Sequence, residues 1–343
     1  MRKLLNTLFI SSEDIYLTLD GENVVANRDK TQVARFPLHT LKGIVTFSYA
    51  GASPALMGKC ADMDIDLVFC TQRGRFLART AGIAHGNVLL RREQYRIADD
   101  SQRSLRFARH MIFGKLYNGR WGLERTLRDH KLRIGEDAFR ASIDTLKGLL
   151  PQVMEAESGD MLRGLEGAGA KAYFDAFDDR ILRNRDAFFF HGRNRRPPLD
   201  NVNAMLSFAY SLLASDCASA LESVGLDAYV GFFHRDRPGR VSLALDLMEE
   251  LRPCVADRFV LTLINNRQLS AADFAAEESG AVRMTDNGRS AFLKAWQERK
   301  KEVVTHPYLQ EKLPWGLVPY MQALLLARCI RGDLDAYPPF LWK

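Results

Sequence analysis

Short apolar runs separated by turn residues fill the N-terminal part of the chain, a pattern typical of β-strands. Period-two alternation within such runs predicts strands, and Asp20-Gly21 is a hairpin signal between two of them. Ser53-Pro54 is typical of a helix start, so a short helix is expected as far as Cys60. The runs expected to form strands are DIYLTL (14–19), VVANR (24–28), VARFPL (33–38), GIVTFS (43–48), DLVFCT (66–71) and RFLART (75–80).

From Val88 onward, apolar residues follow helical spacing in most of the long segments. We expect Pro197-Pro198, Pro253 and Pro314 to interrupt the helices, and the polar stretch 178–198 to form a loop. The pattern predicts a mostly β domain followed by a larger helical one, with HGN (85–87) as the joint. The expected helices are 87–97, 102–130, 136–152, 161–177, 199–223, 242–250, 257–266, 289–303 and 316–331.

The composition of the 343 residues is that of an ordinary globular protein, with 47% hydrophobic and 26% charged residues. The longest apolar runs, such as MQALLLA at 321–327, are far shorter than the roughly 20 residues that span a bilayer. The N-terminus is basic and apolar but reaches Ser-Ser-Glu-Asp by residue 14, without a cleavage site for a signal peptide. We therefore expect a cytoplasmic protein that has no membrane segment.

The cysteines are widely spaced, and no CxxC pair occurs among them. Structural zinc sites, disulfide frameworks and thioredoxin-type redox sites need paired sulfur atoms at short spacing. We therefore expect buried free thiols and no cysteine chemistry. The five are Cys60, Cys70, Cys217, Cys254 and Cys329.

Basic side chains concentrate in two segments. Residues 91–140 hold thirteen Lys and Arg and seven Asp and Glu, so the net charge of this segment is +6. This equals the net charge of the whole chain. Arginine binds phosphate oxygens in a bidentate manner, so these segments favour a nucleic-acid backbone, although a solvated helix face would look the same. The second cluster consists of Arg180, Arg183, Arg185, Arg193, Arg195 and Arg196.

The stretch 225–253 is the most informative for chemistry, because it places a histidine and several acidic residues close together. His234 follows a glycine-containing turn, and the next helix carries Asp246, Glu249 and Glu250 at spacings that share a helix face. Leu243, Leu247 and Leu251 form an apolar ridge on this helix, so we expect the carboxylates at its border, partly shielded from water. Alternatively, the acidic residues are solvated helix surface and the histidine is a capping or core residue.

Glu166 adds a further carboxylate, and it lies among small residues in LEGAGAKAYF. The small residues also fit a tight helix–helix crossing, and both interpretations can hold together. Two carboxylates and one imidazole suit Mg²⁺ or Mn²⁺ better than structural zinc. Such an ion next to a phosphodiester supports phosphoryl transfer. No HExxH, Walker A or GxSxG motif offers another chemistry.

Four blocks make the chain similar to the CRISPR-associated integrase of spacer acquisition, the Cas one family, in its type I-C branch. They occur in the order and spacing of the family, and the likeness extends over nearly the whole chain. Gly169 departs from the pattern, because the family commonly has alanine there, and we expect it to loosen the helix without moving Glu166. The blocks are LEGAGAKAYF (165–174), PPLDNVNAMLSFAYSLL (197–213), GLDAYVGFFH (225–234) and LALDLMEELRPCVADR (243–258).

The resemblance implies an α+β fold with an N-terminal β-sandwich-like domain and a larger all-α catalytic domain. We place the first domain, for dimerisation and partner contact, at 1–84, a linker at 85–95, and the metal- and DNA-binding domain at 96–343. Carried over residue by residue, the family's metal ligands fall on Glu166, His234 and Glu249. Asp246 matches a neighbouring ligand or a group that supports one.

The resemblance further implies Mg²⁺ or Mn²⁺ as cofactor and double-stranded DNA as substrate. The 3′-hydroxyl of a captured DNA fragment would attack a phosphodiester at the repeat of the CRISPR array, and two such steps would join both strands. The chain would form a homodimer, with two dimers around one dimer of the small companion protein, Cas two. The alternatives are a non-catalytic DNA-binding scaffold subunit and a metal-dependent phosphodiesterase unrelated to CRISPR.

Overall fold

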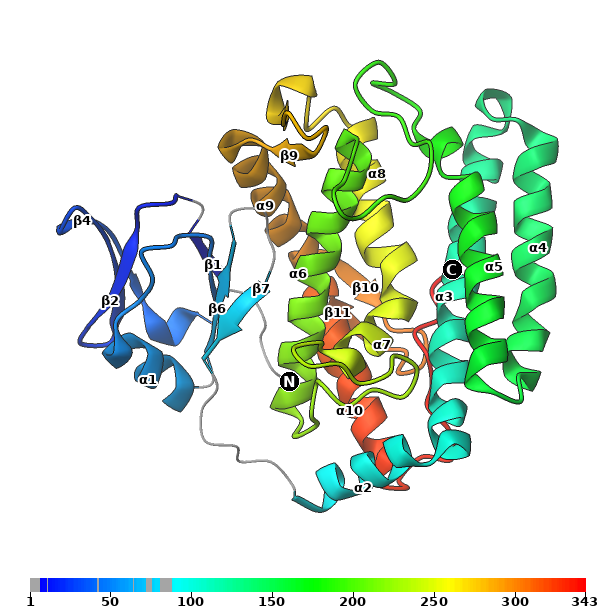
Figure 1. Ribbon diagram of the computed structural model, residues 1–343, viewed down its shortest axis with the longest axis horizontal. Helices are drawn as coiled ribbons and strands as arrows, with labels where there is room; N and C mark the ends of the chain where they lie inside the picture. The colour runs from blue at the N-terminus through cyan, green and yellow to red at the C-terminus, as the bar shows by residue number, and fades with distance from the viewer. Residues whose placement is uncertain (1–6, 11, 42, 64, 72–75, 81–87) are drawn as a thin grey trace.

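The computed structural model describes residues 7–10, 12–41, 43–63, 65–71, 76–80 and 88–343 (Figure 1). Strands gather at the N-terminal end of the molecule, and a larger group of helices follows. The mixed α+β class, with an N-terminal β part and a larger helical part, is therefore confirmed.

Two small sheets and one helix make up the N-terminal part. The helix α1 (Pro54–Asp62) begins at Ser53, whose hydroxyl accepts the amide of Leu56, as the Ser-Pro signal predicts. A mixed sheet has the order β1–β5–β6–β7, with β1 (Thr7–Ile10), β5 (Gly43–Thr46), β6 (Asp66–Cys70) and β7 (Phe76–Arg79). An antiparallel sheet has the order β2–β3–β4, with β2 (Tyr16–Asp20), β3 (Asn23–Arg28) and β4 (Thr31–Pro37).

The sheet that contains β5, β6 and β7 lies against the helical part (Figure 1). The Phe47 and Phe208 rings lie 5.8 Å apart between centroids, and Phe47 belongs to the large apolar core of the helices. Arg79 on β7 forms an ion pair with Glu222 and donates to the hydroxyl of Ser219. Buried aromatic surface and a shielded ion pair therefore join the two parts.

Long helices account for most of the rest of the chain. They lie close to the segments that the apolar spacing predicts, usually within about three residues at each end. Beyond α2 (Val88–Asp99), they are α3 (Ser101–His130), α4 (Glu136–Glu155), α5 (Gly159–Asp175), α6 (Asn201–Ser223), α7 (Ser242–Leu251), α8 (Arg258–Asn265), α9 (Asp286–Lys301) and α10 (Val318–Ile330). Residues 88–95 of the expected linker thus lie in α2, whereas 85–87 fall outside the described residues.

Helix α6 lies in the middle of the helical part (Figure 1). By length and composition it could cross a membrane, but most of its apolar window is buried inside the protein. Its hydrophobic character is accounted for by packing against α7, α10 and the π-helical turn Arg252–Asp257 (η4). Helix α6 is therefore the central core helix of this part.

One sequence-based expectation about a backbone break is wrong. Pro253 does not end the helix, because α7 continues through η4 directly into α8. The wider π turn accommodates a residue without an amide hydrogen, and such turns are frequent at functional sites.

Two short hairpins were not predicted from the apolar pattern, because each of their strands is only three residues long. The strands are β8 (Phe274–Ala276), β9 (Val282–Met284), β10 (Val303–Thr305) and β11 (Lys312–Pro314).

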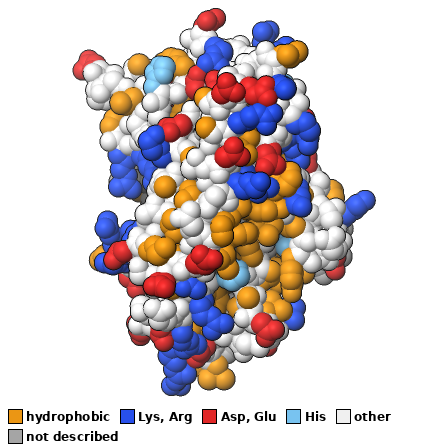
Figure 2. Space-filling view, turned by 90° about the vertical axis from the view of Figure 1, so that its right-hand side faces the viewer, with side chains coloured by type: hydrophobic (Ala, Val, Ile, Leu, Met, Phe, Trp, Pro, Cys, Tyr) orange, Lys and Arg blue, Asp and Glu red, His pale blue; other side chains and the backbone are white. Residues whose placement is uncertain are grey.

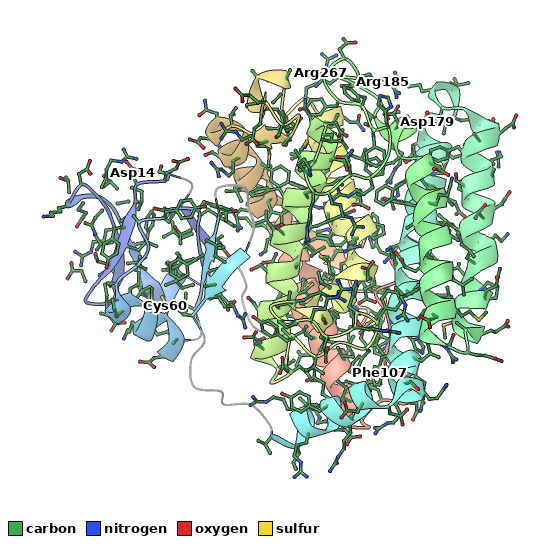
Figure 3. All side chains as sticks on the ribbon, in the orientation of Figure 1. Asp14, Cys60, Phe107, Asp179, Arg185 and Arg267 are labelled. Carbon is green, nitrogen blue, oxygen red and sulfur yellow. The ribbon has the colours of Figure 1, made fainter. Side chains whose placement is uncertain are left out.

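Most of the cysteines are free thiols, as expected. Cys60, Cys217 and Cys254 are buried, and Cys329 is partly exposed. Figure 3 shows Cys60 on α1, and burial raises the pKa of its thiol to about 11. The side chain of Cys70 lies outside the described part of the structure.

Gly169 allows the close approach of α3 and α5. A methyl group at this position would overlap the Leu116 side chain, whereas Gly164 and Gly167 have open space where their Cβ would lie. Helix α5 runs through Gly169 without interruption, so the expected loosening does not interrupt the helix. The tight helix–helix crossing among small residues is confirmed.

Replacing Gly169 by alanine is expected to destabilise the protein by about 1–3 kcal/mol, because the added methyl group overpacks this crossing. Gly167→Ala on the exposed face of the same helix serves as control and should be neutral or stabilise by about 0.5–1 kcal/mol. Denaturant unfolding measures both. Equal stability of the two variants would contradict the packing argument.

Candidate active site

Asp246 on α7 organises the loop that carries His234. One of its carboxylate oxygens accepts the amides of Phe232 and Phe233, at 2.6 and 2.9 Å. The other accepts the amide of His234 at 2.9 Å and lies 2.6 Å from His234 Nδ1. Asp246 is completely buried and both of its oxygens are used, so it positions the histidine ring and is not free to bind a metal.

The orientation of His234 follows from this contact. A carboxylate only accepts, so Nδ1 donates to Asp246, and Nε2 is the ring nitrogen on the side of Glu249 that a metal could use. Nε2 lies 3.9 Å from an oxygen of Glu249. Imidazole rings that bind metals are commonly held by a carboxylate in this way.

Gly231 makes the tight loop around Asp246 possible. A Cβ at this position would lie 2.8 Å from the His234 carbonyl oxygen and 2.9 Å from a carboxylate oxygen of Asp246. Any side chain would therefore push the loop away from the carboxylate. Gly231 in GLDAYVGFFH is therefore required because the loop leaves no space for a side chain.

The predicted ligands Glu166 and Glu249 come together from α5 and α7, which are distant in sequence. Lys115 on α3 lies between them: its ammonium group contacts Glu166 and lies 2.7 Å from Glu249 Oε2. Only 3% of the Glu249 side chain and 12% of the Lys115 side chain are exposed. Two carboxylates from different helices therefore meet at one cation, next to the free nitrogen of His234.

Strong electrostatic interactions keep Glu249 ionised. Its burial alone would raise the pKa of the carboxyl group, but Arg252, Lys115 and His234 together outweigh that effect and lower the pKa to about 2. Arg252 Nη1 lies 3.0 Å from Glu249 Oε1, and its guanidinium stacks over the Tyr210 ring at 4.9 Å. Glu249 is thus a buried carboxylate that stays charged.

Glu250 points in another direction and plays no part in this cluster. It accepts from Tyr337 at 2.6 Å, from Gln322 at 2.7 Å and from the amide of Phe340 at 3.0 Å. Burial among these neutral donors raises its pKa to about 7. Glu250 therefore anchors the C-terminal residues, and the expectation that the α7 carboxylates lie only at the border of the apolar ridge is wrong, because all three are buried.

The donor set fits a hard divalent ion, although its atoms are not gathered around a vacant point. Across the ranges described, no group of three or more His, Cys, Asp or Glu side chains has the arrangement of a metal site. The reason lies in Lys115, whose ammonium group already occupies the position between the carboxylates. Glu166, Glu249 and His234 Nε2 supply the oxygen and imidazole donors that Mg²⁺ or Mn²⁺ accepts.

The comparisons with known proteins identify the family. The model of the family CRISPR associated protein Cas1 matches residues 8–298. The chain belongs to the Cas1 family. A relative from Rhodospirillum rubrum, a CRISPR-associated endonuclease Cas1, is 51% identical, and the match covers all of both chains.

Two solved structures share the Cas1 fold of this chain. A casposase bound to its integration product has a TM-score of 0.85 at 21% identity, covering 99% of this chain and 95% of the casposase. A chain of a Cas6-RT-Cas1–Cas2 complex has a TM-score of 0.82 at 21% identity, covering 100% of this chain and 36% of the longer one. At this identity the likeness concerns the fold alone.

Several residues of the Cas1 site were missed by sequence reasoning. Lys115 carries no motif, and Arg252 was not singled out although it lies in the block 243–258, one helical turn after Glu249. The Tyr210 hydroxyl donates to Asp257 at 2.6 Å. A narrow cavity of about 40 Å³ beside Glu166 is lined by Lys115, Glu166, Arg195, Tyr210, Arg252 and Asp257, among others. Only the three-dimensional crossing of α3, α5 and α7 brings these side chains together.

Many arginines of the two basic segments serve the fold. Arg109 donates to the Ala156 carbonyl, and Arg180 is buried, stacks on Tyr173 and donates to its hydroxyl. Arg185 pairs with Asp178 at the end of the molecule where the 178–198 loop lies (Figure 3). Figure 2, which looks onto the side of α4 and α5, shows basic and acidic side chains mixed around an apolar area. The basic excess along the sequence thus does not form one continuous surface on this face.

Asp246→Asn is expected to weaken the placement of His234, because an amide group cannot accept from all four donors. We expect a loss of about 1–3 kcal/mol in the free energy of unfolding and a roughly 10- to 100-fold lower nuclease rate. Asp236→Asn, an exposed acidic residue in the same loop, is the control and should change neither. Wild-type rate and stability in Asp246→Asn would contradict this role.

Proposed function

We propose that this chain is a metal-dependent DNA endonuclease and integrase that inserts foreign DNA fragments into a CRISPR array. The observation that carries the proposal is the meeting of Glu166 and Glu249 at one cation beside His234 Nε2. The endonuclease name of its full-length relative and the casposase fold likeness support it.

Glu166, His234 and Glu249 would hold Mg²⁺ or Mn²⁺. When bound, such an ion supplies positive charge to the phosphodiester and favours the ionised form of the attacking hydroxyl. Asp246 holds the His234 ring so that Nε2 faces Glu249, and Arg252 keeps Glu249 ionised. These residues are thus oriented before any substrate arrives, which reduces the reorganisation needed in the transition state.

The reaction we propose exchanges one phosphodiester for another. The 3′-oxygen of the fragment loses its proton and forms a bond to phosphorus in the repeat, while the bond from phosphorus to the target strand's 3′-oxygen breaks. That oxygen takes up a proton and leaves as a new 3′-hydroxyl. Since the number of phosphodiester bonds does not change, no nucleotide hydrolysis is required. Two such steps join both strands.

The substrate we propose is double-stranded DNA, and Arg195 is well placed to contact it. Arg195 lines the cavity beside Glu166 and has no carboxylate partner in the described ranges. An arginine in this position can pair with a phosphate oxygen near the reacting bond.

We further propose a homodimer that assembles with Cas2, as two dimers around one Cas2 dimer. The fold likeness to part of a Cas6-RT-Cas1–Cas2 complex supports this partner. The type I-C branch and the cytoplasmic location remain predictions from the sequence.

A strand-transfer assay tests the function directly. A labelled DNA duplex with free 3′-hydroxyls is incubated with a supercoiled plasmid that bears a repeat, together with Cas2 and Mn²⁺ or EDTA. We expect product only with metal, and a loss of more than about 100-fold for His234→Ala and Glu249→Gln with DNA binding retained. His39→Ala, an exposed histidine of the N-terminal part, is the control and should be as active as wild type. Binding of DNA without joining, by wild type and variants alike under every metal, would favour the scaffold alternative.

Lys115→Met is expected to raise the affinity for Mn²⁺, because the ion no longer competes with an ammonium group for Glu166 and Glu249. We expect roughly tenfold tighter binding, equivalent to about 1.4 kcal/mol. Isothermal titration calorimetry of the protein without DNA measures this. Lys147→Met on the exposed side of α4 is the matched control. Unchanged or weaker Mn²⁺ binding in Lys115→Met would show that the ammonium group does not occupy the metal position.

A further inference from the structure

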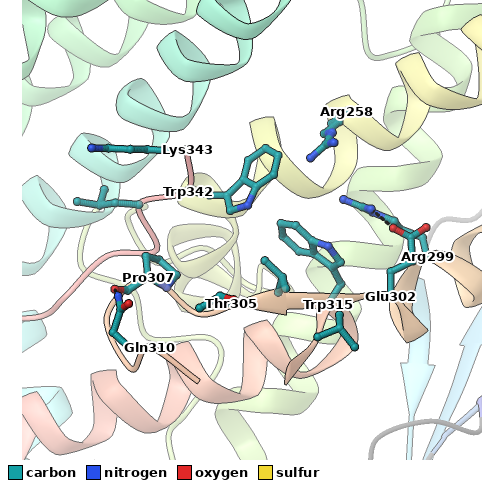
Figure 4. A pocket seen from close by; sticks show the side chains of 12 residues that line it. Arg258, Arg299, Glu302, Thr305, Pro307, Gln310, Trp315, Trp342 and Lys343 are labelled. Carbon is teal, nitrogen blue, oxygen red and sulfur yellow. Dashed lines mark hydrogen bonds and ion pairs between the residues drawn. The ribbon is translucent and has the colours of Figure 1, made fainter. Parts of the chain in front are cut away.

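A second cavity lies where α8, α9, the β10–β11 hairpin and the C-terminal residues meet (Figure 4). Its volume is about 770 Å³, which is within the range of about 300–1,000 Å³ that is usual for small-molecule sites. Its lining residues differ from those of the cavity beside Glu166. The cavity is therefore separate from the proposed active site.

The charged groups of this cavity are predominantly cationic. Arg258, Arg299 and Lys343 line it, and Glu302 supplies the one acidic side chain among its described lining residues. Glu302 pairs with Nη1 of Arg299, whereas Nη2 of the same guanidinium is buried and has no hydrogen-bond partner in the described ranges. One donor of this cation therefore has no acceptor among the described residues.

The charge of Arg258 is compensated in part by Glu302, although no ion pair joins the two side chains in the part of the chain described. Burial, together with the positive charges of Arg299 and Arg125, lowers the pKa of Arg258 to about 10. Like charges held together in a partly buried place are costly, and a bound anion would relieve this cost.

Two indole rings form the walls of the same cavity. The Trp315 and Trp342 rings lie 5.6 Å apart between centroids, at 73° to each other. The guanidinium groups of Arg258 and Arg125 each lie 4.4 Å from the Trp342 ring, and that of Arg299 lies 4.7 Å from the Trp315 ring. Thr305 and Gln310 from the hairpin add polar groups at the edge. Aromatic surface, guanidinium groups and polar edges thus occur within one small volume.

We propose that this cavity binds a nucleoside polyphosphate. The phosphates would pair with Arg258 and Arg299, and the planar base would contact Trp342, the more exposed of the two indole rings. A purely inorganic anion would leave the aromatic walls unused, and a neutral ring would leave the cations only partly compensated. The same chemistry is offered by a free nucleotide or by the 5′-phosphorylated end of a strand.

Titration of the full-length protein with ATP in the presence of EDTA tests the site without metal at Glu166 and Glu249. Calorimetry gives the affinity, and tryptophan fluorescence reports the cavity, because two of the four tryptophans of the chain line it. We expect one ATP per chain, bound at least tenfold tighter than either tripolyphosphate or adenosine. A 5′-phosphorylated trinucleotide that displaces ATP and binds more tightly would identify the strand end as the source of the ligand.

Two variants locate the binding. Arg258→Gln removes a cation, and Thr305→Trp fills the cavity without changing charge; each should weaken ATP binding at least tenfold. Lys294→Gln, on the exposed side of α9, removes the same charge outside the cavity and should bind ATP like wild type. The proposal is overturned if tripolyphosphate binds as tightly as ATP or if both variants bind ATP normally. The proposal is also overturned if the two variants no longer bind Cas2 but still bind ATP like wild type, because the cavity would then be a protein contact.

Discussion

Three buried carboxylates on one short helix set the main constraint on this structure. An ionised carboxylate inside a protein is costly unless donors or cations compensate it. Asp246, Glu249 and Glu250 are all buried on α7, and a different set of groups compensates the burial of each carboxylate. Backbone amides and a histidine satisfy Asp246, cations from α3 and η4 satisfy Glu249, and neutral donors of the C-terminal part satisfy Glu250. These three solutions bring the His234 loop, α3 and the chain's last residues around α7.

This arrangement relates stability to chemistry. The residues that make the burial of Glu249 tolerable, Lys115 and Arg252, are the same ones that keep it ionised and place it beside Glu166 and His234. The π-helical turn at Pro253 keeps α7 and α8 in one continuous path. The site therefore lies on packed helices, and its loop is fixed by a buried acceptor.

Much of the fold could be predicted from local patterns, because most helices and strands here bury an apolar face with a regular period. The Ser53-Pro54 helix start and the long helices α3 and α6 are examples. The hairpins of β8–β11 could not be predicted, since three-residue strands have too few positions to show alternation. The effect of Pro253 was misjudged because a π turn is stabilised by packing that a local pattern does not contain.

The candidate site was predicted in part. The pairing of His234 with the acidic residues of α7 could be anticipated from the compact loop and the helical spacing. The different contacts of Asp246, Glu249 and Glu250 could not be predicted. Successive residues point about 100° apart around a helix, and their partners come from distant segments of the chain. Lys115 lies 51 positions before Glu166 and has no motif, so only the crossing of α3 and α5 reveals it.

We propose that Glu166, His234 and Glu249 form one divalent-ion site, in which Lys115 takes the place of the ion in this structure. Crystals of the protein soaked in Mn²⁺ would test it by anomalous diffraction. The account predicts a single strong anomalous peak bonded to Glu166, Glu249 and His234 Nε2, with the Lys115 ammonium moved away. A Mn²⁺ peak elsewhere, with Lys115 still between the two carboxylates, would contradict it.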